Sequence, residues 1–485
     1  MAKASAAVQE AFRFALDPTP RQERRFLSHA GGARYAYNWG IAQIAAALDA
    51  YQAEKAAGVE KPTTKIPTHF DLCKQWTQYK DDPANGLGWV GENFVGTYQA
   101  ALRDAAAAWK AFFDSRTGKR KGRRVGRPRF KSRKKDRPAF QLHGTVRMES
   151  ATRIRLPKIG SVRVLSDHDW RWRDGHKGCA DAERNRRRSR QLWDLTAAGQ
   201  ARIVRATISR EPDGLWFASV TVELTGAAAA AARPERPTRR QQRGGTIGLD
   251  LGVKYLAVAS TGQVWANPRP YQAVLDQLRH AQRALSRTQD GSRRRERARR
   301  RVAVLHARVR RARRGAMIRA VSQITREYEH IVVEGWDVQR VMQHGTPDAP
   351  RRVRAARNRE LADSARGDFR ARLQLAAPRV GSKVTVLDAH TPTGRTCSAC
   401  GQVRAKPVPP AEELFSCPAC GYTAPRRLNT ARVLVRLATQ AAPQGVEPRG
   451  GDVRPVTPRR GGRSPVKRAA RARSSVRGKT GTPGP

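Results

Sequence analysis

The order of apolar and polar residues divides the first part of the chain into a strand and helices. Residues Ala11 to Leu16 predict a strand, and prolines at positions 18 and 20 mark a turn before the first helical stretch. Between residues 96 and 115 the apolar positions recur three and four residues apart. This spacing predicts an amphipathic helix, because it places the apolar side chains on one face.

The stretch from 139 to 225 is rich in short β-type segments. In the last of these, every second residue is apolar, and that side carries Trp216, Ala218, Val220, Val222 and Leu224. Strict alternation predicts antiparallel strands with one buried face. We expect these strands to form a small β-barrel that the N-terminal strand closes.

A different pattern begins at Thr246, after a low-complexity linker over residues 226–244. A buried strand and its hairpin partner come first, and a long Arg-rich helical region follows over residues 271–329. The segments HIVVEG and KVTVLDA then predict two more strands with helix between them. Beyond residue 442 the chain is rich in Pro, Gly and Arg, and we expect this tail to be disordered.

The charge of the chain indicates a polyanionic partner. Its 485 residues include 95 Lys and Arg against 41 Asp and Glu, a formal net charge of +54. A compositional preference for Arg would explain the choice of base, but not the excess over acids. Nucleic acid is the partner that fits this charge.

The positive charge is densest in RTGKRKGRRVGRPRFKSRKKDRP, which begins at Arg116. A solvated loop is the simplest interpretation of a charge run, but the glycines here would also let the backbone approach phosphates closely. The candidate nucleic-acid contacts are Lys119, Arg120, Lys121, Arg123, Arg124, Arg127, Arg129 and Lys131, together with Tyr35 and Asn38 in the first helical stretch.

Two acids stand in or at the end of apolar strands. Asp250 lies within TIGLDLG, where Gly248 and Gly252 leave room for a ligand or another backbone, and Glu334 ends HIVVE. A buried carboxylate needs a partner. For either acid alone that partner could be one of the many arginines. For the pair, brought to the edge of one sheet, we favour an ancestral Mg²⁺ site, since Mg²⁺ prefers oxygen ligands.

Four of the six cysteines form two CxxC pairs. Cys397 and Cys400 are separated by sixteen residues from Cys417 and Cys420, and a glycine follows the second cysteine of each pair. This spacing predicts a structural zinc site with four thiolate ligands. The other two, Cys73 and Cys179, are expected to be reduced thiols in an intracellular protein.

Neither a membrane span nor a secretory signal is expected. No segment has the roughly 18 apolar residues that a span requires, and the N-terminus lacks an apolar signal core before its first charges. We therefore expect a cytoplasmic, nucleoid-associated protein.

Taken together, the motifs resemble the TnpB proteins of insertion sequences and the related compact type V CRISPR effectors. The resemblance covers FRFALDPTPRQERRFLSHAGGARYAYNWGIA, KGRRVGRPRFKSRKK, the DLG and VE strands, VLDAHTPTGRTCSACG and LNTARVL. It implies guide RNA and double-stranded DNA as partners, and a multidomain α+β fold. The implied parts are a helical recognition lobe, a small β-barrel wedge domain, an RNase H-like (RuvC) α/β domain with an inserted zinc ribbon, and a disordered basic tail.

The resemblance places the domain boundaries as follows: wedge domain 1–17 and 116–225, recognition lobe 18–115, linker 226–244, RuvC-like domain 245–395 and 425–442, zinc ribbon 396–424, and tail 443–485. It makes Asp250 the first RuvC acid and Glu334 the second.

The third RuvC acid is missing from its expected place. In relatives, the second zinc pair is followed by Asp-Arg-Asp-x-Asn-Ala-Ala, and an ungapped match through Asn429 puts Pro425 and Arg427 at the two Asp positions. A guanidinium about 5 Å from a divalent ion repels it by about 6–7 kcal/mol at an effective dielectric constant near 20. We therefore expect an RNA-guided DNA-binding protein with lost or impaired cleavage, in which Arg427 pairs with Asp250 and Glu334.

Other readings remain open. The chain could be an active endonuclease, with Mg²⁺ as cofactor and a relocated third acid at Asp388, Glu447 or Asp452. It could also be a decayed transposon passenger. An RNA-independent zinc-ribbon DNA-binding protein is a further alternative, but such a protein would not need the two acid-bearing strands.

Overall fold

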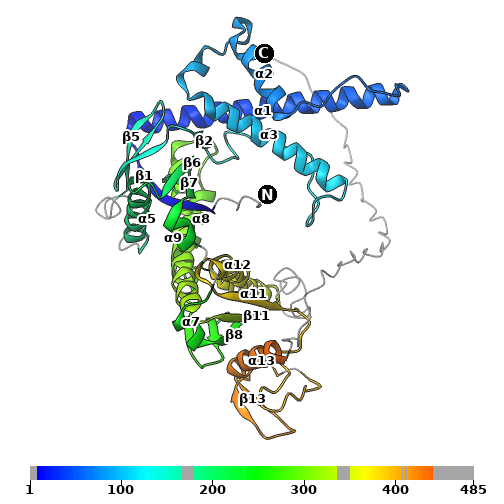
Figure 1. Ribbon diagram of the computed structural model, residues 1–485, viewed down its shortest axis with the longest axis vertical. Helices are drawn as coiled ribbons and strands as arrows, with labels where there is room; N and C mark the ends of the chain where they lie inside the picture. Colours follow the sequence, from blue (N-terminus) through cyan, green and yellow to red (C-terminus); the bar gives the residue numbers. More distant parts are fainter. Residues whose placement is uncertain are drawn as a thin grey trace, which may run out of the picture. The chain divides into compact units, whose positions relative to one another are not determined.

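The computed structural model describes residues 8–165, 180–232, 234, 236–335, 350–406, 408–409 and 412–440. It is a mixed fold of helices and sheets (Figure 1). The tail expected to be disordered, together with Cys179, Glu447 and Asp452, lies outside the described residues. Within the described residues, no helix is long and apolar enough to cross a membrane.

The first sheet has seven antiparallel strands in the order β2-β6-β7-β1-β5-β4-β3. They are β1 (Val8–Asp17), β2 (Ala139–His143), β3 (Arg147–Ser150), β4 (Arg153–Leu156), β5 (Gly160–Val164), β6 (Ala201–Arg210) and β7 (Trp216–Leu224). The predicted alternation in β7 is confirmed, because every second residue from Trp216 to Leu224 is buried. The N-terminal strand β1 lies between β7 and β5 and pairs with both.

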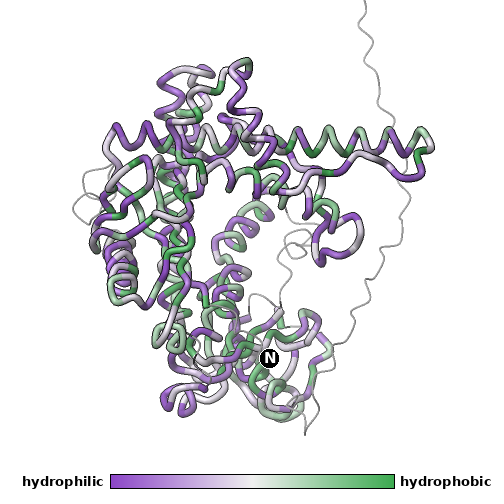
Figure 2. The backbone as a smooth tube through the Cα atoms, turned by 45° about the horizontal axis from the view of Figure 1, so that its top comes forward, coloured by the Kyte–Doolittle hydropathy of each residue, from purple (hydrophilic) through white to green (hydrophobic). Residues whose placement is uncertain are grey.

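Helices α1 (Pro20–Ala56) and α3 (Val95–Arg116) pack against β2 of this sheet, and α2 (His69–Asp81) packs on α1 and α3. Helix α5 (Ala180–Ala197) packs on β1. Thr19 caps α1 through a reciprocal pair of hydrogen bonds with Gln22, which fixes where the helix begins. The ring of Phe26 lies 4.9 Å from that of Trp216, so helices and sheet share one hydrophobic core. Figure 2 colours the backbone by the hydropathy of each residue and shows that apolar and polar positions are interspersed along the helices.

The segment expected to be a linker contains two short helices, α6 (Gly226–Ala231) and α7 (Arg239–Gly244). Alanine has the highest helix propensity, which accounts for α6. The side chain of Gln241 in α7 is buried and donates hydrogen bonds to the carbonyls of Thr325 (2.7 Å) and Val380 (2.8 Å). The end of this segment is therefore anchored on the fold that follows it.

The second sheet has five strands in the order β10-β9-β8-β11-β12. They are β8 (Thr246–Leu251), β9 (Tyr255–Ala259), β10 (Val264–Ala266), β11 (His330–Glu334) and β12 (Lys383–Leu387), and β8, β11 and β12 are parallel. The helices of this part are α8 (Leu275–Ser286), α9 (Arg293–Glu327), α11 (Arg351–Ser364) and α12 (Arg366–Ala376). Residues of α9 and α12 share a core with Leu249 of β8 and Val333 of β11.

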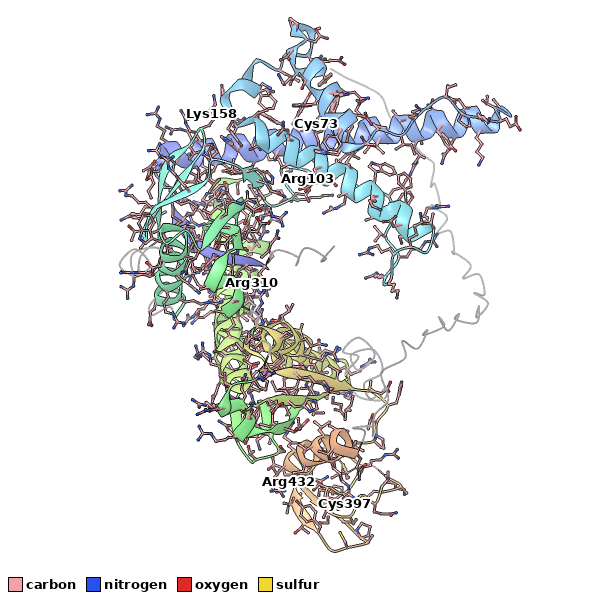
Figure 3. The ribbon with its side chains drawn as sticks, viewed as in Figure 1. Cys73, Arg103, Lys158, Arg310, Cys397 and Arg432 are labelled. Carbon is pink, nitrogen blue, oxygen red and sulfur yellow. The ribbon has the colours of Figure 1, made fainter. Side chains whose placement is uncertain are left out.

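Part of the arginine content of α9 is structural. Glu211, which directly follows β6, forms ion pairs with Arg310 of α9 and with Arg13 and Arg137. The buried Asp213 forms an ion pair with Arg311, also on α9. Arg310 is labelled in Figure 3.

The last described part of the chain forms the hairpin β13 (Leu414–Ser416) and β14 (Thr423–Pro425), which leads directly into α13 (Arg426–Gln440).

Candidate functional site

The register of the second sheet brings the two strand acids together. Val333 pairs with Leu249 in the parallel ladder of β11 and β8, so Glu334 and Asp250 come next on adjacent strands. Leu249 and Val333 point into the core shared with α9. Because side chains alternate along a strand, the acids lie on the opposite face of the sheet. The carboxylates of Asp250 and Glu334 are close enough that the negative charge of Glu334 raises the pKa of Asp250.

Helix α13 lies against this face, and glycines permit its close approach. A β-carbon at Gly248 would stand 2.0 Å from the carbonyl oxygen of Ala431, and one at Gly252 would stand 2.1 Å from Nη1 of Arg427. The room that the two glycines leave beside Asp250 is therefore filled by another backbone and by a guanidinium, and not by open space.

Arg427 forms an ion pair with Asp250. Its Nη1 donates to Oδ2 of Asp250 at 3.0 Å, and the two side chains are only 27% and 14% exposed. Burial raises the pKa of Asp250 to about 6, and Glu334 acts in the same direction, while Arg427 and Arg366 oppose the rise. The hydroxyl of Thr393 donates to Glu334. The ion pair expected between Arg427 and the first acid is thus present, and Thr393 donates a hydrogen bond to the second.

Arg366, the first residue of α12, is a second cation at this site that the sequence did not single out. Burial lowers its pKa to about 10, while Asp250 and Glu334 both act to raise it. The backbone on either side is fixed. Ala365 adopts a left-handed conformation at φ 44°, and Phe369 in the next turn is fully buried. In a stretch with so many arginines, no local pattern distinguishes Arg366 from its neighbours.

These residues do not fit a divalent metal ion. The two carboxylates that would hold Mg²⁺ share their surroundings with two guanidinium groups, one of them in direct contact with Asp250. The positive charges already balance the negative ones, and they would repel a cation placed between them. We therefore derive no metal-dependent step at this site.

Asp388, the described candidate for a relocated third acid, follows β12 directly. Leu387 pairs with Glu334 in the parallel ladder, so these two residues share a face of the sheet. Because side chains alternate along a strand, the next residue, Asp388, falls on the opposite face from the acid pair. Its side chain is exposed and accepts a hydrogen bond from the backbone N–H of His390 at 2.7 Å. The Asp388 carboxylate is therefore hydrogen-bonded within the turn that follows β12, and the register of β12 does not place it beside Asp250 and Glu334.

The four predicted cysteines come together. Their sulfur atoms all lie within 4.8 Å of one another, with Cys397 to Cys420 at 3.8 Å and Cys400 to Cys417 at 3.6 Å. A tetrahedral zinc ion with bonds of about 2.3 Å requires sulfur–sulfur separations of about 3.8 Å. The four cysteines therefore form a cluster that could hold a metal ion, and its dimensions fit zinc. Cys397 is labelled in Figure 3.

The cysteine cluster is joined to the helix that carries Arg427. Asn429 of α13 is fully buried, accepts a hydrogen bond from the N–H of Ser398 (2.9 Å) and donates to the carbonyl of Thr396 (2.8 Å). Arg436, two turns later, donates to the carbonyls of Ser398 and Cys400. The first CxxC turn and the start of α13 thus form one unit, which positions Arg427.

The basic segment combines exposed cations with a few that bind within the protein. The candidates whose side chains are exposed are Lys119, Arg120, Lys121, Arg123, Arg124, Arg127 and Arg129. Of these, Arg127 pairs with Asp49 and Arg129 with Asp136. Lys131 is partly buried with its Nζ 3.6 Å from the ring centre of Tyr37, and burial lowers its pKa.

Asn38 and Tyr35, the candidates on α1, differ in their surroundings. The Asn38 amide donates to the carbonyl of Lys131 (2.9 Å) and accepts from its N–H (2.8 Å), so it holds the basic segment against α1. Tyr35 is 37% exposed and lies at an open groove together with Trp39 and Trp89. Both residues line this groove: Asn38 holds the basic segment there, and Tyr35, whose hydroxyl is hydrogen-bonded to that of Tyr79, exposes part of its ring.

Comparison with known proteins matches three family profiles to separate parts of the chain. They are described as "Helix-turn-helix domain" (residues 5–55), "Probable transposase" (residues 229–344) and "Cas12f1-like, TNB domain" (residues 367–434). Proteins named "Putative RNA-guided DNA endonuclease" in two strains of Mycobacterium tuberculosis are 30% identical over 472 residues, which cover 94% of this chain and 92% of theirs. A similarly named Streptomyces pristinaespiralis protein is 26% identical over 91% of this chain and 92% of its own.

Solved structures also align with the chain at low identity. A Cas12f1–sgRNA–target DNA complex aligns at 10% identity and a TM-score of 0.36, covering 88% of this chain and 98% of the other. The mini-RNA-guided endonuclease CRISPR-Cas_phi3 aligns at 10% identity and a TM-score of 0.42, covering 90% and 93%.

Proposed function

Because the chain belongs to the TnpB family of RNA-guided DNA endonucleases, which includes the compact type V effectors, we propose that it binds double-stranded DNA under the direction of a guide RNA without cleaving it. The ion pair between Arg427 and Asp250 carries this proposal. A protein of this kind would occupy a chosen DNA site at the nucleoid and could block transcription there.

The loss of cleavage follows from what occupies the acid face. In a metal-dependent nuclease, carboxylates hold the cations that stabilise the charge developing on the phosphate. Here Asp250 accepts a hydrogen bond from Arg427, with Arg366 nearby as a second cation. At neutral pH both guanidinium groups carry their positive charge, so the site does not become a metal site by deprotonation.

Binding does not depend on this face. The charge of +54 is distributed over several segments, and seven of the eight candidate cations of the basic segment are exposed. Such a chain repels itself unless a polyanion neutralises it, which supports RNA as a bound partner. The four cysteines would hold one structural zinc ion, since four thiolates leave no open position for a reacting water.

The test is the nucleic acid that copurifies with the full chain. After a moderate-salt wash, we expect a structured RNA that sequencing identifies as one species or a few, and we expect binding that weakens steeply with salt. An absorbance ratio typical of protein alone would contradict the proposal. In that case the RNA-independent zinc-ribbon DNA-binding protein becomes the better interpretation.

An active nuclease with a relocated acid remains the second candidate. Of the candidates for such an acid, Asp388 lies within the described residues, directly after the strand that pairs with β11. Its offset from the acid face and its hydrogen bond to His390 weigh against it. Substituting Asp388 with Asn in a protein that cleaves DNA would decide the role of this residue.

A further inference from the structure

Phe130 is an exposed aromatic residue within the basic segment. Its side chain is 58% exposed, whereas Phe12, Phe14, Phe26 and Phe140 are at most 2% exposed. An exposed phenyl ring contributes little to folding, because it stays in water. Exposure alone does not imply a partner, since Phe70 is 75% exposed. Phe130 differs from Phe70 in its place within the basic segment, where exposed cations surround it in the sequence.

The backbone that follows Phe130 is held by hydrogen bonds. The Asn38 amide both donates to and accepts from the backbone of Lys131, and the N–H of Ser132 donates to Asp136 at 2.6 Å. Before Phe130, the exposed side chain of Arg129 pairs with Asp136 at 3.1 Å.

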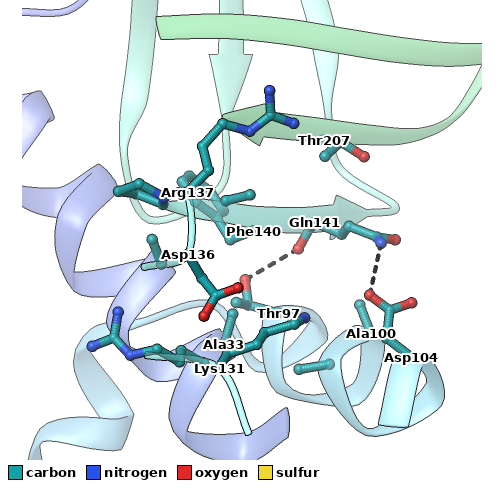
Figure 4. Close-up of a pocket in the computed structure, with 15 residues that line it drawn as sticks. Ala33, Thr97, Ala100, Asp104, Lys131, Asp136, Arg137, Phe140, Gln141 and Thr207 are labelled. Atoms are coloured by element: carbon teal, nitrogen blue, oxygen red, sulfur yellow. Dashed lines mark hydrogen bonds between the residues drawn. The ribbon is translucent and has the colours of Figure 1, made fainter. Parts of the chain in front are cut away.

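The buried side of this turn is visible in Figure 4. Lys131 and Asp136 lie next to Thr97 and Phe140 at a pocket of about 280 Å³. The residue after Phe130 is thus hydrogen-bonded to α1 on the inner side, while the Phe130 side chain is exposed.

The charge around the ring selects the kind of partner. Arg124, Arg127 and Arg129 precede Phe130 and have exposed side chains. Arg127 also pairs with Asp49 and Arg129 with Asp136, both at the surface. An exposed aromatic ring in a basic segment matches an unpaired nucleotide, whose base can stack on the ring while its phosphates meet cations of the segment. An apolar protein partner would instead have to bury these guanidinium groups, which is unfavourable.

We propose that Phe130 is a base-stacking contact for an unpaired nucleotide of the bound RNA, with the neighbouring arginines on its phosphates. This inference rests on the proposed function and extends it to a particular residue and kind of contact. RNA is favoured over duplex DNA because structured RNAs offer unstacked bases in loops and bulges. A duplex must first be unstacked, at a cost of a few kcal/mol per step.

The experiment measures binding of the RNA that is extracted from the wild-type complex. That RNA is labelled and rebound to nucleic-acid-free full-length protein over a series of NaCl concentrations. The variants are Phe130→Ala, Phe130→Trp, Arg124→Ala and Phe70→Ala. Phe70 is the matched control, because it is a 75% exposed phenylalanine outside the basic segment. Melting temperatures check that each variant folds.

We expect Phe130→Ala to weaken binding roughly 5- to 100-fold, the loss of one stacked base, with the salt dependence unchanged. Phe130→Trp should bind as the wild type does, and Phe70→Ala should have no effect. Arg124→Ala should reduce the slope of log K against log salt by about 0.7 to 0.9, as expected for one lost phosphate contact.

Wild-type affinity in Phe130→Ala would overturn the inference. So would normal RNA affinity combined with weaker DNA binding by the RNA-loaded variant, which would assign the ring to DNA. A wild-type protein that carries no RNA would contradict the proposed function itself, and this outcome is distinct from the other two.

Discussion

Gly252 and Arg427 lie so close that a β-carbon at position 252 would stand 2.1 Å from Nη1 of the arginine. The two residues are separated by 175 positions in the sequence, yet the guanidinium fills the space that the glycine leaves beside Asp250. A metal site would need that space for an ion and its waters. The contact therefore makes the acid face an ion-pair site, with the guanidinium in the space beside Asp250.

The first prediction follows from this contact. Gly252→Ala forces the Arg427 guanidinium out of its position and away from Asp250. The side-chain end can move at little cost, but losing its hydrogen bond to a buried carboxylate should cost about 1–3 kcal/mol. In an Arg427→Ala background the same substitution should cost clearly less, although the carbonyl of Tyr255 also lies 3.0 Å away. Thermal unfolding of the four proteins measures this coupling. Equal costs in the two backgrounds would mean that Arg427 does not occupy this space.

The second prediction concerns pH. The pKa of Asp250 is raised to about 6 from 3.8, so the folded protein binds a proton that the unfolded chain releases between these values. This group therefore contributes stability below pH 4 that is lost as the pH rises through 6, a total of about 3 kcal/mol. Above pH 6 Asp250 is ionised, and only there does it need Arg427.

Arg427→Met should accordingly destabilise the protein by about 3 kcal/mol at pH 8, where it leaves a buried carboxylate without its cation, and by much less at pH 5. Arg432→Met is the control. Arg432 lies on the same helix but donates to the hydroxyl of Tyr422 at 2.7 Å, so its removal strands no carboxylate. Melting temperatures at the two pH values test the pattern. A pH-independent loss in Arg427→Met would contradict the ion pair.

The third prediction concerns the cysteine cluster. We expect about one zinc ion per chain by elemental analysis, and loss of that zinc in Cys417→Ser. Because metal binding normally supplies the folding free energy of such a module, chelation should also unfold the part of the chain that contains β13 and β14. Cys73→Ser is the matched control, since Cys73 lies on α2 and is not part of the cluster. Zinc-independent folding of the module would refute the assignment.

Several of these features could be predicted from the sequence because they depend on local patterns. The alternation in β7, the acids within apolar strands and the paired cysteines all correspond to observed strands or clusters. Arg366 could not be found in this way, because its significance depends on where α12 starts relative to β8. The contact between Asn38 and Lys131 spans 93 residues and likewise has no local pattern.

The fourth prediction separates the two cations of the acid face. Arg427→Asp restores a third carboxylate, but Arg366 remains, and we expect this variant to bind Mn²⁺ no better than the wild type. Arg427→Asp combined with Arg366→Leu should bind Mn²⁺ measurably, as detected by the loss of the free-ion EPR signal. Arg432→Asp with Arg366→Leu controls for the change in net charge. If Arg427→Asp alone binds as well as the double variant, Arg366 has no part in excluding metal.

Guided cleavage by the unmodified protein tests the central claim most directly. The purified complex with its copurified RNA is incubated with target DNA in Mg²⁺ and, separately, in Mn²⁺, and binding and cutting are followed in the same reaction. The proposal predicts a stable complex with intact DNA in both metals, and the same targeting by Asp250→Ala. DNA that is cut by the wild-type protein and left whole by Asp250→Ala would contradict it, and would establish an active nuclease with a relocated third acid.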